Sequence, residues 1–274
     1  MTDFIIENET SLRLGVFLSI LITMMAVEAI LPRKSRTMGR AHRWVSNLLL
    51  IIIDGLFVRL LFPIVAVGIA ALSIKNGWGL FNFTNWPIWL EITLAIIILD
   101  MMIYWQHVAT HHIPLLWALH KVHHADRDID VTTGSRFHPI EIGLSLIYKM
   151  ALVAMIGAPV LAVIIFEIIL NGCAMFNHSN VKLPLRFDRF LRVFIVTPDM
   201  HRVHHSTLTS ETNSNYGFSL SLWDRLFKSY TNQPSKGHDE MIIGLEEHQS
   251  SGPASLSWSL LLPFKSVKRL ETWL

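Results

Sequence analysis

Apolar residues in this chain are gathered into four long blocks separated by polar segments. The blocks run from about Leu14 to Leu31, from Trp44 to Ile74, from Ile88 to about Trp105, and from Gly143 to about Leu170. One helical crossing of a bilayer needs about 20 apolar residues, so the first and third blocks each predict one membrane span. The second block is longer and contains Pro63 and Gly68, which favour a kink or an early exit. The pattern predicts an all-α, multi-pass membrane bundle.

The orientation of the spans follows from the basic residues between the first two blocks. This short loop carries Arg33, Lys34, Arg36, Arg40 and Arg43. Loops rich in Lys and Arg stay on the cytoplasmic side, so the third span is expected to return to the cytoplasm just before His107. The first block lacks the basic start and cleavage site of a signal peptide, and we interpret it as an anchor.

The fourth block has two possible topologies. One long tilted span would place everything after Asn171 on the outer side, whereas a break at Gly157-Ala158-Pro159 would turn the chain back as a hairpin. The hairpin is required if the histidine-rich segments on both sides share one site. The following segment carries Lys182, Arg186, Arg189 and Arg192, which also favours the cytoplasm. We therefore predict a membrane hairpin at about 143–170.

Composition supports the membrane class and excludes several others. The chain of 274 residues is 51% hydrophobic and only 16% charged, whereas soluble domains are about a quarter charged. A net charge of +2 with no basic stripe argues against nucleic-acid binding. The single cysteine, Cys173, excludes an intramolecular disulfide and a cysteine-based metal cage.

Most of the 14 histidines stand in short motifs with the spacing of metal ligands. The motifs are His107-Val-Ala-Thr-His111, His120-Lys-Val-His123-His124 and His201-Arg-Val-His204-His205. Residues at i, i+3 and i+4 share one side of a helix, so each motif can present two or three imidazoles together. We predict these eight as metal ligands, with His178 and His138 as further candidates. We interpret His42, His112, His238 and His248 as ordinary histidines.

The number of imidazoles suggests two ions, because a single zinc ion usually takes only three or four protein ligands. Imidazole itself suits Zn, Cu, Fe and Ni. A redox-active pair beside a membrane could oxidise an unactivated C–H bond of a lipid. Asp100 and Tyr104 fall on one helical stripe with His107 and His111, and Asp100 could orient a ligating imidazole through its free N–H. We predict that both residues support the metal ligands without binding the metal.

These motifs resemble those of the fatty acid hydroxylase/sterol desaturase superfamily of membrane di-iron oxygenases, over roughly Asp100 to Tyr230. Further matches are Asp100 with Tyr104, the Arg136–Pro139 stretch with Glu141, and the segments Asn213–Gly217 and Leu222–Phe227. The resemblance is closest to the bacterial sterol-desaturase-like and alkylglycerol-monooxygenase-like branch. It implies that the eight motif histidines bind two irons per chain. Some relatives carry a second histidine four residues before His178, where this chain has Ala174, so the ligand count of one iron stays open.

The resemblance implies a lipid hydroxylase or desaturase that uses O2 and electrons from a separate donor protein or reductase chain. We expect an N-terminal transmembrane region (1–106), a di-iron hydroxylase core (107–235) containing the hairpin, and a cytoplasmic tail (236–274). The metal site is expected on the cytoplasmic side, in a histidine-rich helical cap. Two other classes remain open: a non-redox, histidine-rich metal-binding membrane protein and a zinc-dependent lipid hydrolase. The substrate is not determined among acyl, sterol and related lipids.

Overall fold

The computed structural model describes residues 2–266, and within them the chain is helical, without a β-strand. The prediction of an all-α membrane protein is confirmed. Five helical stretches are long and apolar enough to cross a membrane. They comprise α2 (Glu9–Ile30), α3 (Arg40–Leu61) with α4 (Ala66–Asn76), α5 (Ile88–His112), α7 (Pro139–Ile156) and α8 (Val160–Asn177).

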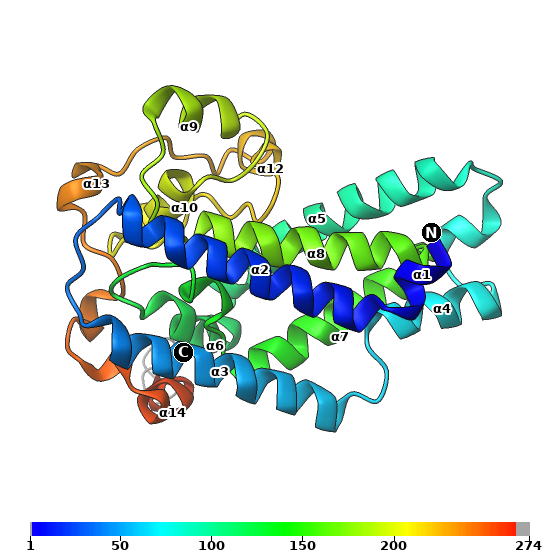
Figure 1. Cartoon of the computed structure of the whole chain (residues 1–274), viewed down its shortest axis with the longest axis horizontal. Helices are drawn as coiled ribbons and strands as arrows, with labels where there is room; N and C mark the ends of the chain where they lie inside the picture. Colours follow the sequence, from blue (N-terminus) through cyan, green and yellow to red (C-terminus); the bar gives the residue numbers. More distant parts are fainter. Residues whose placement is uncertain (1, 267–274) are drawn as a thin grey trace.

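The long helices lie side by side along the longest axis of the molecule, and the shorter ones gather at one end of this bundle (Figure 1). At this end, which we call the cap, α2, α5 and α8 finish and α3 and α7 begin. The cap contains α6 (Pro114–His124), α9 (Leu185–Leu191), α10 (Pro198–His204), α11 (Thr209–Thr212), α12 (Leu222–Leu226), α13 (Gly237–Glu240) and α14 (Leu256–Ser266). Four 3-10 turns, η1 to η4, lie at Leu80–Phe83, Thr133–Ser135, Glu246–His248 and Gly252–Ala254, and α1 spans Thr2–Glu7.

The breaks between helices fall at prolines and glycines. The second apolar block is two helices rather than one kinked span, because the chain leaves the helix at Phe62, whose backbone is extended before Pro63. Pro114 opens α6 in the same way after the end of α5. Gly157 ends α7 in the left-handed conformation, with φ of 67°, and Pro159 precedes α8. The fourth block therefore folds back on itself, and both of its outer ends lie in the cap (Figure 1).

At the end of the bundle opposite the cap, the backbones of Gly79 and Gly157 are in close contact. A Cβ atom on Gly79 would lie 2.1 Å from the backbone nitrogen of Gly157, and one on Gly157 would lie 2.7 Å from the carbonyl oxygen of Trp78. Only glycine allows this approach of two backbones. The loop before α5 is thereby seated on the turn between α7 and α8.

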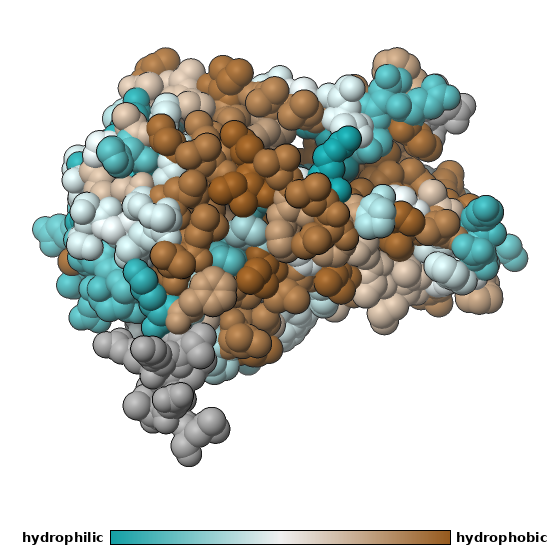
Figure 2. Space-filling model, turned by 90° about the horizontal axis from the view of Figure 1, so that it is seen from below, coloured by the Kyte–Doolittle hydropathy of each residue, from teal (hydrophilic) through white to brown (hydrophobic). Residues whose placement is uncertain are grey.

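The apolar side chains divide between a core and an outer surface. Leu99, Val153, Ala162 and Phe166 pack inside the bundle among α4, α5, α7 and α8. Many large apolar side chains of α2 and α3 are instead exposed, among them Leu18, Ile22, Ile52 and Leu56. The face seen in Figure 2 has a broad hydrophobic area over the middle of the molecule and hydrophilic residues at the cap end. This distribution is that of a multi-pass membrane protein whose outer surface faces lipid.

The basic loop between α2 and α3 is folded onto the cap. Arg33 pairs with Asp199 at 3.2 Å, and the buried Arg43 pairs with Asp126 at 2.7 Å and with Asp130 at 2.8 Å. These partners are more than 80 residues away along the chain, so Arg33 of the loop and Arg43 in the first turn of α3 both fasten this part of the chain to the cap. The predicted division into regions 1–106, 107–235 and 236–274 stays a prediction, and residues 267–274 of the last region lie outside the described part.

Candidate metal centre

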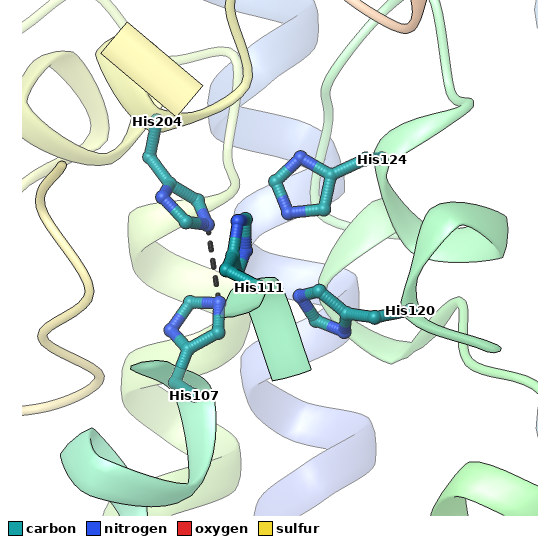
Figure 3. A group of neighbouring side chains, drawn as sticks. All are labelled: His107, His111, His120, His124 and His204. Carbon is teal, nitrogen blue, oxygen red and sulfur yellow. Dashed lines mark hydrogen bonds between the residues drawn. The ribbon is translucent and has the colours of Figure 1, made fainter. Parts of the chain in front are cut away.

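Nine buried or half-buried histidines form two neighbouring groups in the cap. The first group consists of His107, His111, His120, His124 and His204; the second consists of His123, His178, His201 and His205. Within each group, one ring nitrogen of every histidine lies within 4.8 Å of those of the others. The structure thus brings together all eight motif histidines and His178. Figure 3 shows the five imidazoles of the first group converging from α5, α6 and the end of α10.

Each triplet motif contributes histidines to both groups, in opposite proportions. On α6, His120 and His124 belong to the first group and His123 to the second. In the later triplet, His201 and His205 belong to the second group and His204 to the first. Residues at i and i+4 point in nearly the same direction on a helix, whereas the residue at i+3 points to a slightly different side. The two triplets therefore bridge the two groups.

Backbone carbonyl groups fix the orientation of three rings. The Nδ1 atom of His107 lies 2.8 Å from the carbonyl oxygen of Tyr216, that of His204 lies 2.7 Å from Ser214, and that of His178 lies 2.7 Å from Ala174. Because a carbonyl oxygen only accepts, each Nδ1 must carry the proton, which leaves the lone pair on Nε2. These Nε2 atoms face the interior of the groups.

The facing lone pairs fit a cation. The Nε2 atoms of His107 and His204 are 3.1 Å apart, although neither carries a proton to donate to the other. The Nε2 atoms of His111, His120 and His124 are buried without a hydrogen-bond partner. Two nitrogens bound at about 2.1 Å and at right angles on one ion would be about 3.0 Å apart. The donor set therefore fits a metal ion in the first group.

The second group shows the same character. The Nε2 atom of His178 is 3.0 Å from the Nε2 atoms of both His123 and His201. Both ring nitrogens of His205 and the Nδ1 atoms of His123 and His201 lack a hydrogen-bond partner. Unpaired buried polar atoms are costly, and such a concentration of them fits a second ion. The two groups hold five and four ligand atoms respectively.

Burial keeps the imidazoles in the form that binds metal. It lowers the pKa of His204 to about 3 and that of His178 to about 4, with neighbouring imidazoles acting in the same direction. The pKa values of His123, His124, His201 and His205 are also well below the usual range, first because of burial and then because of nearby histidines. A neutral imidazole is the ligating form.

Glu141 supports His120 from the start of α7. Its Oε1 atom lies 2.6 Å from the Nδ1 atom of His120, so the carboxylate accepts a hydrogen bond from Nδ1–H and leaves the lone pair of Nε2 directed toward the first group. A carboxylate behind a ligating histidine fixes its tautomer and strengthens its basicity. The sequence offered Glu141 only as part of the family resemblance, because it stands 21 residues from its partner.

Asp100 contacts the segment that orients an imidazole and not the imidazole itself, which differs from the expectation that it would orient one directly. Its Oδ2 atom accepts hydrogen bonds from the indole of Trp223 at 2.8 Å and from the backbone of Leu220 at 3.2 Å. The Tyr104 hydroxyl lies 2.8 Å from that of Ser229. Both residues thus hold the segment after Tyr216, whose carbonyl oxygen orients His107.

His138 lies outside both groups, which corrects its inclusion among the candidate ligands. Its Nδ1 atom accepts a hydrogen bond from the backbone of Ile140 at 3.2 Å, so the residue caps the start of α7. The structure also shows a role for Arg136, which the sequence alone did not reveal. This residue is fully buried and donates hydrogen bonds to the carbonyl oxygen of Val122 at 2.8 Å and to Asn47 at 2.6 Å. It thereby connects α6 to α3.

A cavity of about 290 Å³ leads from the first histidine group into the bundle. His107, His120, Glu141 and Thr110 line its cap end, and apolar side chains such as Ile103 and Leu146 line its middle. Gly134 forms part of its wall, where a Cβ atom would come within 2.6 Å of the carbonyl oxygen of Ala174. The shape and lining suit a mostly apolar ligand that reaches the histidines.

Comparison with known proteins gives one family and several distant relatives. The family model described as fatty acid hydroxylase matches residues 92–229, about half of the chain. An ornithine lipid hydroxylase of Rhizobium tropici is 28% identical over 58% of this chain and 47% of its own length. An alkylglycerol monooxygenase of Danio rerio is 30% identical over 61% of this chain and 36% of its own. A lathosterol oxidase of Rattus norvegicus is 25% identical over 61% and 56%.

The chain spans about half the length, or less, of the first two of these relatives. No solved structure matches it significantly. The matched region contains all nine clustered histidines together with Asp100, Glu141 and Tyr216.

Proposed function

Because this chain belongs to the fatty acid hydroxylase family, we propose that it is a membrane-bound di-iron oxygenase that hydroxylates or desaturates a lipid. The observation that carries the proposal is the pair of histidine groups, with five and four ligand atoms, in contact through two shared motifs. Iron is the metal of this family, and two irons per chain would occupy the two groups. Bound there, they would supply the reductive activation of O2 needed to oxidise an unactivated C–H bond.

The protein's own residues prepare the site for this chemistry. The carbonyl oxygens of Tyr216, Ser214 and Ala174 hold imidazoles with Nε2 directed inward, and the Glu141 carboxylate does the same for His120. The apolar walls of the cavity exclude water and place a lipid carbon beside His107 and His120. Electrons would come from a separate donor protein or reductase chain, since the sequence shows no motif for a nucleotide or haem.

We place the metal centre on the cytoplasmic side of the membrane. The basic loop before α3 lies at the cap end of the bundle (Figure 1), and loops rich in Lys and Arg stay in the cytoplasm. The cap also carries Arg186, Arg189 and Arg192. A cytoplasmic position would give an intracellular reductase access to the site.

The other two classes considered from the sequence are not favoured. The relatives are named as a hydroxylase, a monooxygenase and a sterol oxidase, rather than as hydrolases or metal-storage proteins. The nine clustered histidines come from the last two turns of α5, from α6, from the end of α8 and from α10 with the residue after it. They therefore gather at one end of the spans and do not line a path across the membrane, which argues against a metal-binding protein that transports its metal.

Metal analysis combined with lipid analysis tests this function. The purified protein is expected to hold two irons per chain, and cells that express it are expected to contain a lipid with one added oxygen or two fewer hydrogens. The His204→Ala variant, expressed to the same level, should lose the lipid product. Zinc in place of iron, with no O2 consumed in the presence of lipid and reductant, would contradict the proposal. Lipid oxidation by iron-loaded protein with NAD(P)H alone would contradict the separate electron donor.

A further inference from the structure

The cavity ends, on the side away from the histidines, at three charged residues inside the bundle. Arg13 of α2, Lys149 of α7 and Glu167 of α8 all line it. Glu167 is the most buried of the three, with its side chain 5% exposed. Its Oε2 atom pairs with Arg13 at 2.7 Å and its Oε1 atom with the ammonium of Lys149.

Lys149 and Glu167 lie within the apolar helices α7 and α8, where charges are costly and usually serve a function. The purely structural explanation is an ion network that ties α2 to the hairpin. Two cations share one buried carboxylate at the cavity wall, however, and Glu9, the second partner of Arg13 at 3.0 Å, does not line the cavity. Glu9 and Glu167 together balance the charges of Arg13 and Lys149, but at the cavity wall itself the two cations meet only the carboxylate of Glu167 among the described residues.

Lys149 also has more N–H donors than its contact with Glu167 uses. Lys149 has three N–H groups, and Glu167 is its one carboxylate partner. Lys149 lies in the middle part of α7, its side chain is 16% exposed, and it lines the cavity. Unused N–H donors on charged groups in a low-dielectric site favour an oxygen ligand that carries negative charge, because such hydrogen bonds are charge-assisted.

The distance between the two polar ends is set by α7. Glu141 marks the histidine end of the cavity and Lys149 the other, and eight helical residues correspond to about 12 Å. Between them the cavity is lined by Ile142, Ser145 and Leu146 of the same helix. The cavity therefore has charged groups at its two ends and a mostly apolar wall in between.

We infer that Arg13 and Lys149 bind an acidic oxygen group of the lipid, a carboxylate or a phosphate, while its apolar chain runs toward the histidines. A carbon well along the chain, rather than one beside the acidic group, would then be presented to the metal centre. This inference rests on one part of the proposed function, namely that the cavity binds a lipid. It excludes an uncharged lipid, such as a free sterol, as the preferred ligand.

Binding of defined lipids without turnover tests the inference. Purified full-length protein in an uncharged detergent is titrated with palmitate, with lysophosphatidate and with hexadecanol, and bound lipid is measured by native mass spectrometry. The Lys149→Met variant keeps the length of the side chain and leaves Glu167 paired with Arg13. Lys75→Met, at an exposed position on α4, is the matched control.

The acidic lipids should bind to Lys149→Met at least about tenfold more weakly than to the unmodified protein or the control, because a hydrogen bond to a charged group is lost. Hexadecanol should bind equally to all three proteins. If the Lys149→Met change weakens the binding of palmitate alone, the ligand is a free fatty acid. If it weakens the binding of lysophosphatidate alone, the ligand is a phospholipid. Equal weakening of all three lipids, or no weakening of any, would overturn the inference. These results leave the proposed oxidation untouched, because no reaction is measured.

Discussion

At the residue scale, the two ring nitrogens of His107, His178 and His204 have different roles. Their Nδ1 atoms are held by backbone carbonyl oxygens, which leaves the lone pairs of Nε2 directed into the histidine groups. The sequence indicates which side chains can be ligands, but a hydrogen bond to a carbonyl group has no signature in residue type. The ring orientation is therefore a property of the folded backbone.

Removing a ligand from the smaller group should release its metal. In His178→Ala, three ligands would remain in the second group, and we expect the iron content to fall from two per chain to about one. Elemental analysis of the purified protein measures this. The control is His138→Ala, which removes a helix cap at a cost of about 1 kcal/mol and should retain both irons. Equal iron in the two variants would show that His178 is not a ligand.

Weakening the support of a ligand should have a smaller effect than removing the ligand. In Glu141→Gln, the charge-assisted hydrogen bond to His120 becomes a neutral one, and we expect iron affinity to fall by about 10- to 100-fold. Competition with a chelator measures the affinity. Glu240→Gln, on the exposed surface of the cap, is the control. An unchanged affinity in Glu141→Gln would mean that the carboxylate does not act on the metal through His120.

At the scale of elements, the hairpin decides whether the metal centre can form. His123 precedes α7 and His178 follows α8, and both belong to the second group. A single long span would have separated them by the thickness of the membrane. The dipeptide Gly157-Ala158 before Pro159 indicated where the chain could turn, but the contact with Gly79 that seats the turn comes from a loop almost 80 residues earlier.

A side chain at the turn should therefore destabilise the bundle. Gly157→Ala forces a non-glycine residue to φ of 67° and into the carbonyl oxygen of Trp78, so we expect a loss of at least about 1–2 kcal/mol and a lower melting temperature in detergent. Gly55→Ala, on α3 with open space around it, should be neutral or stabilising, since alanine is the better helix former. Equal melting temperatures for these two variants would contradict the packing of the turn.

At the scale of the whole molecule, the arrangement of the spans predicts which loops share a side of the membrane. The cap lies at one end of the bundle, and the loop around η1 lies at the other (Figure 1). In a Cys173→Ser background, we expect Ser210→Cys in the cap to react with a membrane-impermeant maleimide only after the cells are permeabilised. Asn85→Cys, at an exposed position before α5, should react in intact cells. The reverse pattern would place the metal centre outside the cell.

The sequence by itself determined the all-helical membrane class, the approximate spans and the histidines available for metal binding. These properties depend on local periodicity, because hydropathy blocks and i, i+4 spacing act within one helix. The second apolar block indicated a kink or an early exit but not two separate helices, α3 and α4. His138 was predicted as a ligand because it lies near the histidine motifs along the chain, which does not determine its position in space.

Only the tertiary structure decided how the histidines divide into two groups, that Glu141 supports His120, and that Arg13, Lys149 and Glu167 meet at one end of a cavity. Each of these contacts joins helices that are far apart along the chain. Spacing within a helix fixes which side chains point the same way, whereas the packing and rotation of one helix against another decide what they point at.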